Sequence, residues 1–292
     1  MKISRLSKKY SRWGWIFVCP AALLICIMSF YPMIQAFILS LQSGMGNNLR
    51  YTGLRNYVRL FRDEMFITSV VNVVVYLIIQ VPIMIFLALV LASILNSNKL
   101  KFRGFFRTLV FLPSATALVS SALIFKSFFS PDGFINIGLM QLHLISQPVN
   151  WLTNPGLAKL VIILVITWRW TGYDTIFYLA GLQNINPEIY EAALIDGASP
   201  VQRFFKITLP LLRPVILLTT IMSTNGTLQL FDEVYNMTAG GPGIATMTIS
   251  QYIFNLSFRY NPQFGYAAAV SYTILIMVAF LSFIQMKAGD QK

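Results

Sequence analysis

The sequence predicts an all-α polytopic membrane protein with six transmembrane helices and both termini in the cytoplasm. Of its residues 56% are hydrophobic and only 11% are charged, and the mean hydropathy is +0.66. A soluble domain carries about a quarter charged residues, so this chain has too few to cover a soluble surface. Six apolar runs are each long enough to cross about 30 Å of hydrocarbon. We treat residues 1–292 as a single transmembrane domain.

The six apolar runs succeed one another with short polar segments between them. The first, at 15–39, comes after a basic segment; it is too long for the apolar part of a signal peptide, and no small-residue cleavage site comes after it. We therefore expect an uncleaved first span. The fifth run is unusually polar because Asn225, Gln229 and the acidic pair 232–233 lie toward its end. The remaining predicted spans are 67–95, 105–129, 157–183, 211–235 and 266–286.

Basic residues set the predicted orientation, since cytoplasmic loops retain Lys and Arg. An inside N-terminus puts most of the 22 basic residues on the inner side, whereas the outer segment 130–156 has none. This retention explains the net charge of +12 without a nucleic-acid partner, and it also places the segment 184–210 in the cytoplasm. The inner basic residues are Lys2, Arg5, Lys8, Lys9, Arg12, Lys99, Lys101, Arg103, Arg107, Arg203, Lys206, Arg213, Lys287 and Lys292.

The segment 184–210 has the sequence of two short helices with a break between them. Asn186 is a suitable N-cap, and Pro187 suits a first helical position, where its missing N–H costs nothing. Gly197 supplies a stop with permissive backbone angles. Ser199 and Gln202 have the spacing of a capping box. By these features alone, the segment is an amphipathic connector at the membrane surface.

The same segment matches a known motif position by position. Glu-Ala-Ala, three residues, Gly, nine residues, Ile, one residue and Leu-Pro resembles the loop of permease subunits in binding-protein-dependent ABC importers. The resemblance implies the type I importer permease fold and a cytoplasmic helix seated in a cleft of a separate ATPase. The residues to which it gives ATPase coupling are Glu191, Ala192, Ala193, Asp196, Gly197, Ala198, Ile207, Leu209 and Pro210.

Segments between the spans extend this resemblance over nearly the whole chain. Residues 53–57, Gly-Leu-Arg-Asn-Tyr, predict a short surface helix, 130–133 a turn, and 238–243 a glycine-rich bend. In the carbohydrate branch of the family, of the maltose, multiple-sugar and glycerol-phosphate type, a similar Gly-Leu-x-Asn segment comes after span one and a Gly-Gly-Pro turn after span five. The resemblance implies that this chain forms half of a translocation path for a carbohydrate.

The resemblance also implies partners and a location. These are a second permease subunit, expected to be a different chain, a dimer of ABC ATPases and an extracytoplasmic solute-binding protein, in the plasma membrane of a bacterium. The chain has no Gly-x-x-x-x-Gly-Lys-Ser/Thr loop, so we expect ATP and Mg on the partner ATPase, no cofactor on this chain and no enzymatic activity of its own.

Three further residues are of types that carry chemistry, but structural roles suit them better. His143 is expected to be a solvated loop residue, and no nucleophile–His–acid set is spaced for bond hydrolysis. Cys19 and Cys26 lie in the first apolar run and are expected to pack inside the membrane, since they form neither a disulfide framework nor a metal-binding spacing. The sequence therefore predicts neither catalytic residues nor metal ligands.

Polar and aromatic side chains within spans four and five form a candidate substrate path. Such groups are costly in lipid unless they face protein or a water-filled cavity, and spacings of three, four and seven place them on common helix faces. Aromatic rings can pack on the apolar face of a sugar while hydroxyls and amides bond its OH groups. Small and hydroxyl-bearing residues also suit helix–helix packing. The candidates are Trp170, Tyr173, Ser223, Asn225, Gly226, Thr227, Gln229 and Leu230.

Two other functions are compatible with the predicted spans. An ion-coupled secondary transporter would need coupling groups near the midplane and internal repeats; only Arg169 and Asp174 are candidates, and no repeat is visible. A non-transporting membrane anchor would not need polar faces on adjacent helices. Arg169 is expected to snorkel or to pair between helices. The sequence leaves open whether Arg169 and Asp174 contact substrate, and which sugar is carried.

Overall fold

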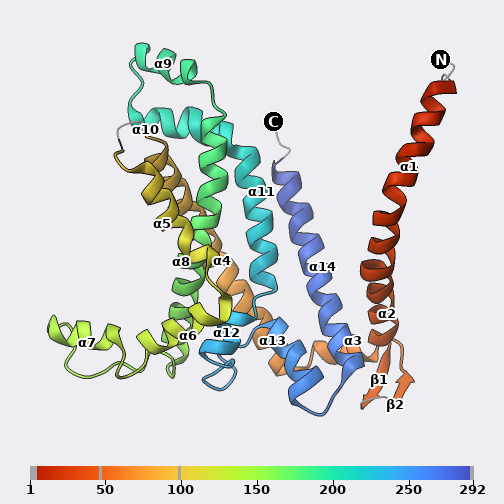
Figure 1. Cartoon of the computed structure of the whole chain (residues 1–292). Coiled ribbons are helices and arrows are strands. Elements are labelled where there is room, and N and C mark those ends of the chain that lie inside the picture. Colours follow the sequence, from red (N-terminus) through yellow and green to blue (C-terminus); the bar gives the residue numbers. More distant parts are fainter. Residues whose placement is uncertain (1–4, 46–47, 98–99, 290–292) are drawn as a thin grey trace. The chain divides into compact units, whose positions relative to one another are not determined.

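The computed structural model describes residues 5–45, 48–97 and 100–289, and most of these are helical (Figure 1). Lys2, Lys99 and Lys292, which contribute to the predicted orientation, lie outside these ranges. In the described residues, five helices are long and apolar enough to cross a membrane, or six if one bent pair is a single span. The chain forms two compact units, Met1–Arg62 with Ile253–Tyr272, and Asp63–Tyr252 with Thr273–Lys292.

The smaller unit holds the first candidate span, Trp13–Ser40, which leaves its apolar stretch entirely unburied. Cys19 and Cys26 are exposed, so the prediction that they pack is wrong: nothing in the described chain covers that helix surface. The predicted surface helix is confirmed as α3, whereas the preceding hairpin of β1 and β2 was not predicted. The elements are α1 Arg5–Ile25, the π-helix η1 Cys26–Phe30, α2 Tyr31–Ser40, antiparallel β1 Gln42–Met45 and β2 Asn48–Tyr51, and α3 Arg55–Leu60.

Side-chain bonds to backbone fix α3 within the smaller unit. The Asn56 amide donates to the carbonyl oxygens of Ser40 (2.8 Å) and Gln42 (2.7 Å). The Arg59 guanidinium lies 3.9 Å from the centroid of the Tyr266 ring and donates to Gln263 Oε1 at 2.7 Å. These bonds hold α3 between the end of the first span and the start of the last helix.

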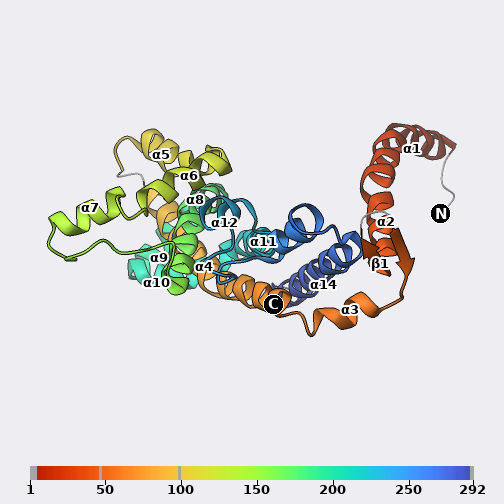
Figure 2. The same cartoon turned by 90° about the horizontal axis from the view of Figure 1, so that it is seen from below.

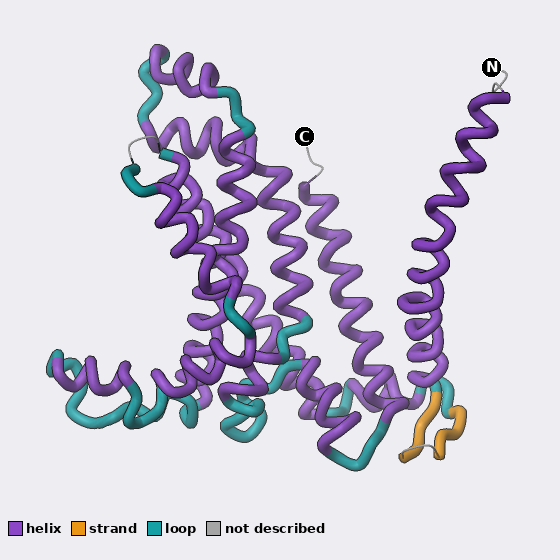
Figure 3. The backbone as a smooth tube through the Cα atoms, in the orientation of Figure 1, coloured by secondary structure: helices purple, strands orange, loops and turns teal. Residues whose placement is uncertain are grey.

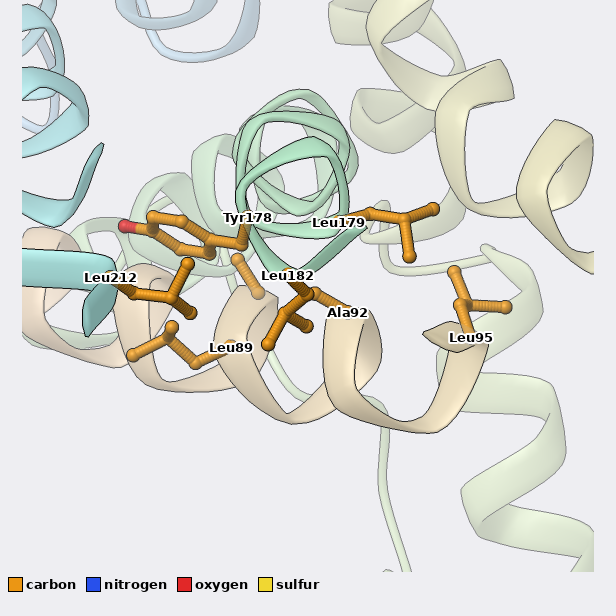
Figure 4. Close-up of a cluster of buried hydrophobic side chains, with 8 residues drawn as sticks. Leu89, Ala92, Leu95, Tyr178, Leu179, Leu182 and Leu212 are labelled. Atoms are coloured by element: carbon orange, nitrogen blue, oxygen red, sulfur yellow. The ribbon is translucent and has the colours of Figure 1, made fainter. Parts of the chain in front are cut away.

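In the larger unit, α8 is the central helix. It packs against α4, α5 and α11, and Figure 2 shows these helices side by side. Residues of α4, α8 and α11 form a buried cluster that includes Leu89, Tyr178 and Leu212 (Figure 4). The elements are α4 Glu64–Asn96, α5 Arg103–Ala115, α6 Leu118–Phe128, α7 Phe134–Gln141, α8 Pro155–Gln183, α9 Pro187–Ile195, α10 Pro200–Arg203, the π-helix η2 Phe204–Thr208, α11 Leu209–Leu228 and α12 Asp232–Met237. The π-helix η3 Asn255–Arg259 belongs to the smaller unit, and α13 Ile249–Phe254 and α14 Phe264–Gly289 each contribute residues to both units.

The third predicted span is not a single helix. Its two halves, α5 and α6, meet at 95° across Thr116 and Ala117, both of which have extended backbone. Figure 3 shows the short non-helical joint between them. Within the apolar run 105–129 the sequence signals a break only at Pro113. The bonds that hold the joint come from α8, more than fifty residues later in the chain, so the run itself does not predict the joint.

The fifth span begins earlier and ends earlier than predicted. The capping box of Ser199 and Gln202 is confirmed, but the helix that it starts continues through η2 into α11 instead of ending before position 211. The wider turn of the π-helix precedes Pro210, whose ring and missing N–H disturb a regular α-helix. The helix ends at Leu228, and 232–237 form the separate helix α12, so the acidic pair 232–233 lies outside the span while Asn225 is still within α11.

The predicted turns are confirmed. The Gly133 amide donates to the Ser130 carbonyl oxygen at 2.9 Å, and the bend 238–243 has positive φ at Ala239, Gly240 and Gly243. His143 is exposed in a loop, as expected. Helix α7, in the segment 130–156, was not predicted.

The close approach of α5 and α8 gives a test of the packing. A Cβ on Gly172 would lie 1.9 Å from the Val110 carbonyl oxygen, so Gly172→Ala must push the helices apart. We expect overpacking to cost about 1–3 kcal/mol and to lower the thermal-unfolding midpoint of the detergent-purified protein. Gly156→Ala in the same helix is the control, since its Cβ would meet only Asn154 Oδ1 at 3.6 Å. Equal midpoints for the two variants would contradict the packing.

Candidate functional site

A cavity of about 390 Å³ lies in the larger unit between α4, α6, α8, α11 and α12. This volume is within the range of small-molecule sites. Of the eight residues predicted for the substrate path, all but Asn225 line it, so two helices that are separate in the sequence present their predicted faces to one space. The lining residues are Gln80, Met84, Leu118, Ile166, Trp170, Tyr173, Asp174, Met222, Ser223, Gly226, Thr227, Gln229, Leu230, Phe231, Asp232 and Glu233.

An aromatic wall on α8 forms one side of this cavity. The rings of Trp170 and Tyr173 are perpendicular, with centroids 5.8 Å apart, and the Tyr173 ring lies 5.1 Å from that of Phe177. Gly226 lines the cavity from α11, and a Cβ placed on it would have open space around it. The combination leaves open space beside an aromatic face.

Hydroxyl, amide and carboxyl groups form the polar part of the wall. Thr227 Oγ1 donates to Gln80 Oε1 at 3.2 Å, and Ser223 Oγ donates to Asp174 Oδ2 at 3.4 Å. Asp174 is 3% exposed and lies in the cavity wall. Gln80 and Met84 come from α4 and were not predicted. Gln80 is a polar residue within the apolar run 67–95, a signal of the same kind as those used in spans four and five, whereas Met84 gave no such signal.

Two further carboxyl groups come from α12, beyond the end of the fifth candidate span. Glu233 is 3% exposed, and its Oε1 has no hydrogen-bond partner among the described residues. Burial raises the pKa of Glu233, while the nearby Arg169 charge opposes that shift. Asp232 beside it is only half-buried. Their polarity was visible in the sequence, but it was assigned to the end of a span instead of a separate helix in the cavity wall.

The remaining polar residues of α11 bond elsewhere. Asn225 is exposed and accepts a hydrogen bond from Gln229 through its Oδ1. Thr224 Oγ1 accepts from Gln285 Nε2 at 2.7 Å, and Thr219 pairs with Tyr178 at 2.6 Å. The helix therefore has one face toward the cavity and other faces whose hydroxyls serve helix packing.

Arg169 pairs between helices, one of the two roles expected for it. Its guanidinium donates to Thr116 Oγ1 (3.2 Å), to the Thr116 carbonyl oxygen (2.8 Å) and to Ser121 Oγ (3.1 Å). The side chain is 5% exposed and is not among the residues that line the cavity.

The second candidate feature is α9, which the structure caps as the sequence predicts. Asn186 accepts a bond from the Glu188 amide at 3.1 Å. At the other end, Gly197 (φ +78°) donates to the Leu194 carbonyl and Ala198 donates to the Ala193 carbonyl, which is a Schellman motif. Helix α9 is therefore a short, well-terminated rod.

The residues of the Glu-Ala-Ala motif divide into an exposed and an anchored group. Of α9, only Ala193 is buried; Ile195 is 86% exposed, and Glu191, Ala192, Asp196 and Gly197 are exposed as well. Leu209 packs against the cluster of α4, α8 and α11. Ala198 and Ile207 are half-buried and Pro210 is exposed.

A hydrogen bond joins the two groups. The Tyr190 hydroxyl lies 2.9 Å from Thr208 Oγ1, and Thr208 is buried at the start of the fifth span. Figure 1 shows α9 and the C-terminal end of α14 at one end of the larger unit, and α7 and α12 at the opposite end. Helix α9 thus projects from the bundle while remaining attached to it at both ends.

Comparison with known proteins gives relatives over the full chain. The lactose transport system permease protein LacF of Rhizobium radiobacter is 52% identical over 99% of this chain and 98% of its own length. The multiple sugar-binding transport system permease protein MsmF of Streptococcus mutans is 32% identical over 100% of this chain and 99% of its own length. A solved bacterial alginate ABC transporter, in complex with alginate pentasaccharide-bound periplasmic protein, has a chain with TM-score 0.83 and 25% identity, covering 98% of this chain and 99% of that one.

The family comparison accounts for most of the larger unit. The model described as "Binding-protein-dependent transport system inner membrane component" matches residues 90–287, a range that holds the bent third span, the cavity-bearing helices α8 and α11, and α9 between them. LacF and MsmF are named as permease proteins, and they match from end to end. The chain therefore belongs to the family of binding-protein-dependent transport system inner membrane components, and it is the permease component of such a system.

Proposed function

We propose that this chain is one of two permease halves of an ATP-driven carbohydrate importer in the bacterial plasma membrane. Its partners would be a second permease of different sequence, a dimer of ABC ATPases that holds ATP and Mg, and an extracytoplasmic solute-binding protein. The names of the relatives support a sugar as the cargo, and lactose is the first probe to test. The observation that carries the proposal is that one rigid helix, α8, bears the cavity wall and leads directly into the exposed rod α9.

The chemistry of the cavity suits a saccharide. The rings of Trp170 and Tyr173 offer an apolar face, while Ser223, Thr227 and Asp174 offer groups that bond hydroxyls. Each sugar hydroxyl both donates and accepts, so a wall with both kinds of partner satisfies it when water is removed. Asn225, which does not line the cavity, is left out of this proposed site.

The exposed motif residues suit a docking role toward the ATPase. The side chains of Glu191, Leu194 and Ile195 extend from a capped helix into open space. Asp174 lies nine residues before the end of α8 at Gln183, which is about 14 Å of helix, and residues 184–186 join α8 to α9. Movement of α9 by an ATPase would therefore reach the cavity through α8 as a rigid-body displacement.

The family assignment favours this function over the two alternatives. An ion-coupled transporter would use Arg169 and Asp174 as coupling groups, but Arg169 is engaged with Thr116 and Ser121 and does not line the cavity. A membrane anchor would explain neither the cavity nor the exposed α9. Both alternatives also leave the match to binding-protein-dependent systems unexplained.

Gly197→Asp tests the docking role of α9. Nothing lies within 4 Å of a Cβ at this position, and Asp tolerates positive φ better than most residues, so the fold should persist. We expect normal insertion, loss of ATPase co-purification and a fall in lactose uptake of about tenfold or more, equivalent to ~1.4 kcal/mol or more of docking energy.

The matched control is Gly53→Asp, at another glycine with positive φ (+59°) and open surroundings. This variant should retain the ATPase. Normal ATPase binding and normal uptake in Gly197→Asp would remove α9 from the coupling mechanism.

Replacing Trp170 and Tyr173 together by alanine tests the cavity. Loss of both rings should reduce the amount of lactose transported per ATP hydrolysed by about tenfold, because each aromatic contact contributes roughly 0.5–1.5 kcal/mol beyond its area. Trp168→Ala is the control: its ring packs on Phe125 with centroids 4.9 Å apart and does not line the cavity. If the double variant assembles with its partners and transports as much lactose per ATP hydrolysed as the wild type, the two rings serve helix packing and do not bind the sugar.

A further inference from the structure

The bonds of Arg169 meet at the break in the third span. The break frees the carbonyl groups at the C-terminal end of α5, since no next turn donates to them. Thr116, the C-cap of α5, offers its carbonyl oxygen to Arg169 Nη2 at 2.8 Å, while its own hydroxyl donates to the Pro113 carbonyl at 2.6 Å. A cation at this position also complements the negative end of the α5 dipole.

The same guanidinium reaches the other side of the break. Its Nη1 donates to Ser121 Oγ in the first turn of α6, as well as to Thr116 Oγ1. The Arg169 side chain therefore bonds both halves of the bent span to α8. Charge-assisted bonds of this kind are stronger than neutral ones, and a carbonyl left without a partner in lipid is strongly unfavourable.

The residues adjacent to these bonded groups form part of the cavity wall. Leu118 is the first residue of α6, two positions after Thr116, and Trp170 is the residue directly after Arg169; both line the cavity. The Arg169 guanidinium carbon lies 5.5 Å from the Trp170 ring centroid. A change in the angle of the break would thus move one wall of the cavity relative to the other.

We propose that Arg169 is a positioning residue: it fixes the α5–α6 break against α8 and thereby sets the distance between the Leu118 and Trp170 walls of the cavity. The consequence for transport rests on the proposed function, whereas the geometric role does not. In this proposal Arg169 does not touch the substrate. It acts through Leu118 and Trp170, which line the cavity next to the groups that Arg169 bonds.

A cross-link measures the geometry without any sugar. Phe125 of α6 and Trp168 of α8 lie in ring contact across the same interface. Each of these two residues is replaced by cysteine in a variant whose Cys19 and Cys26 are replaced by serine. A short bis-maleimide then cross-links the two new cysteines in membranes that contain the whole transporter. We expect Arg169→Met to lower the cross-linking yield about tenfold, since the variant removes all three charge-assisted hydrogen bonds between α8 and the break.

Conservative and partner-side variants separate positioning from folding. Arg169→Lys keeps the charge but not the planar fork of donors, so it should recover only part of the yield. Ser121→Ala and Thr116→Val keep the arginine and should each give a smaller loss, and their effects should not add to that of Arg169→Met. Lys126→Met is the matched control: this cation of α6 also donates to a backbone carbonyl, that of Asn236 at 3.3 Å, but away from the break.

Lactose transported per ATP hydrolysed is the second readout, because a smaller folded fraction lowers both quantities together and leaves their ratio unchanged. We expect this ratio to fall in Arg169→Met and to remain normal in Lys126→Met. An unchanged cross-linking yield in Arg169→Met would overturn the proposal, whatever the ratio. A reduced yield with a normal ratio would support the positioning role and overturn the assignment of the cavity as the sugar path.

Discussion

The packing of α8 against α4, α5 and α11 is the constraint on which the rest of the larger unit depends. Helix α8 contributes to the buried cluster, to the cavity wall and to the support of the broken third span, and it ends just before α9. Close contact is possible because Gly172 admits the Val110 backbone. In a membrane, where apolar surface gives little drive for association, such small-residue contacts and interhelical hydrogen bonds determine which helices meet.

The packing of α8 and α11 holds the helix that carries the Glu-Ala-Ala motif at both of its ends. A helix that is exposed on nearly all sides transmits force only if its ends are held. The Schellman motif and the Asn186 cap keep α9 from fraying. The Tyr190–Thr208 bond joins α9 to the start of the fifth span, and Leu209 packs that span against the core. The spacing between Gly197 and Leu209 is thus a geometric requirement within one chain: an exposed surface at one end and an anchor at the other.

Features set by local chemistry could be predicted from the sequence, and features set by distant contacts could not. The caps at Asn186 and Ser199, the stop at Gly197 and the shared faces of Trp170 with Tyr173 depend on residues within one or two turns. Arg169 bonds Thr116 across more than fifty residues, and Gln80 of α4 bonds Thr227 in the cavity wall. The polarity of Arg169 and Gln80 is visible within their apolar runs, but their distant partners are not. The end of the fifth span was misplaced because polarity was read as part of a helix instead of as its end.

Polar residues within the spans therefore fall into classes that composition cannot separate. Thr219 and Thr224 are as polar as Ser223 and Thr227, yet the first two are bonded to Tyr178 and Gln285 at helix contacts, whereas the second two line a cavity. All four hydroxyls have a side-chain partner on a neighbouring helix, since Thr227 bonds Gln80 of α4 and Ser223 bonds Asp174 of α8, so the bond alone does not separate the two classes. A hydroxyl or carboxyl at the edge of open space, such as Ser223 with Asp174, has capacity left for a ligand. The face of α11 on which a residue lies, set by its contacts with α8 and α4, decides which of these it does.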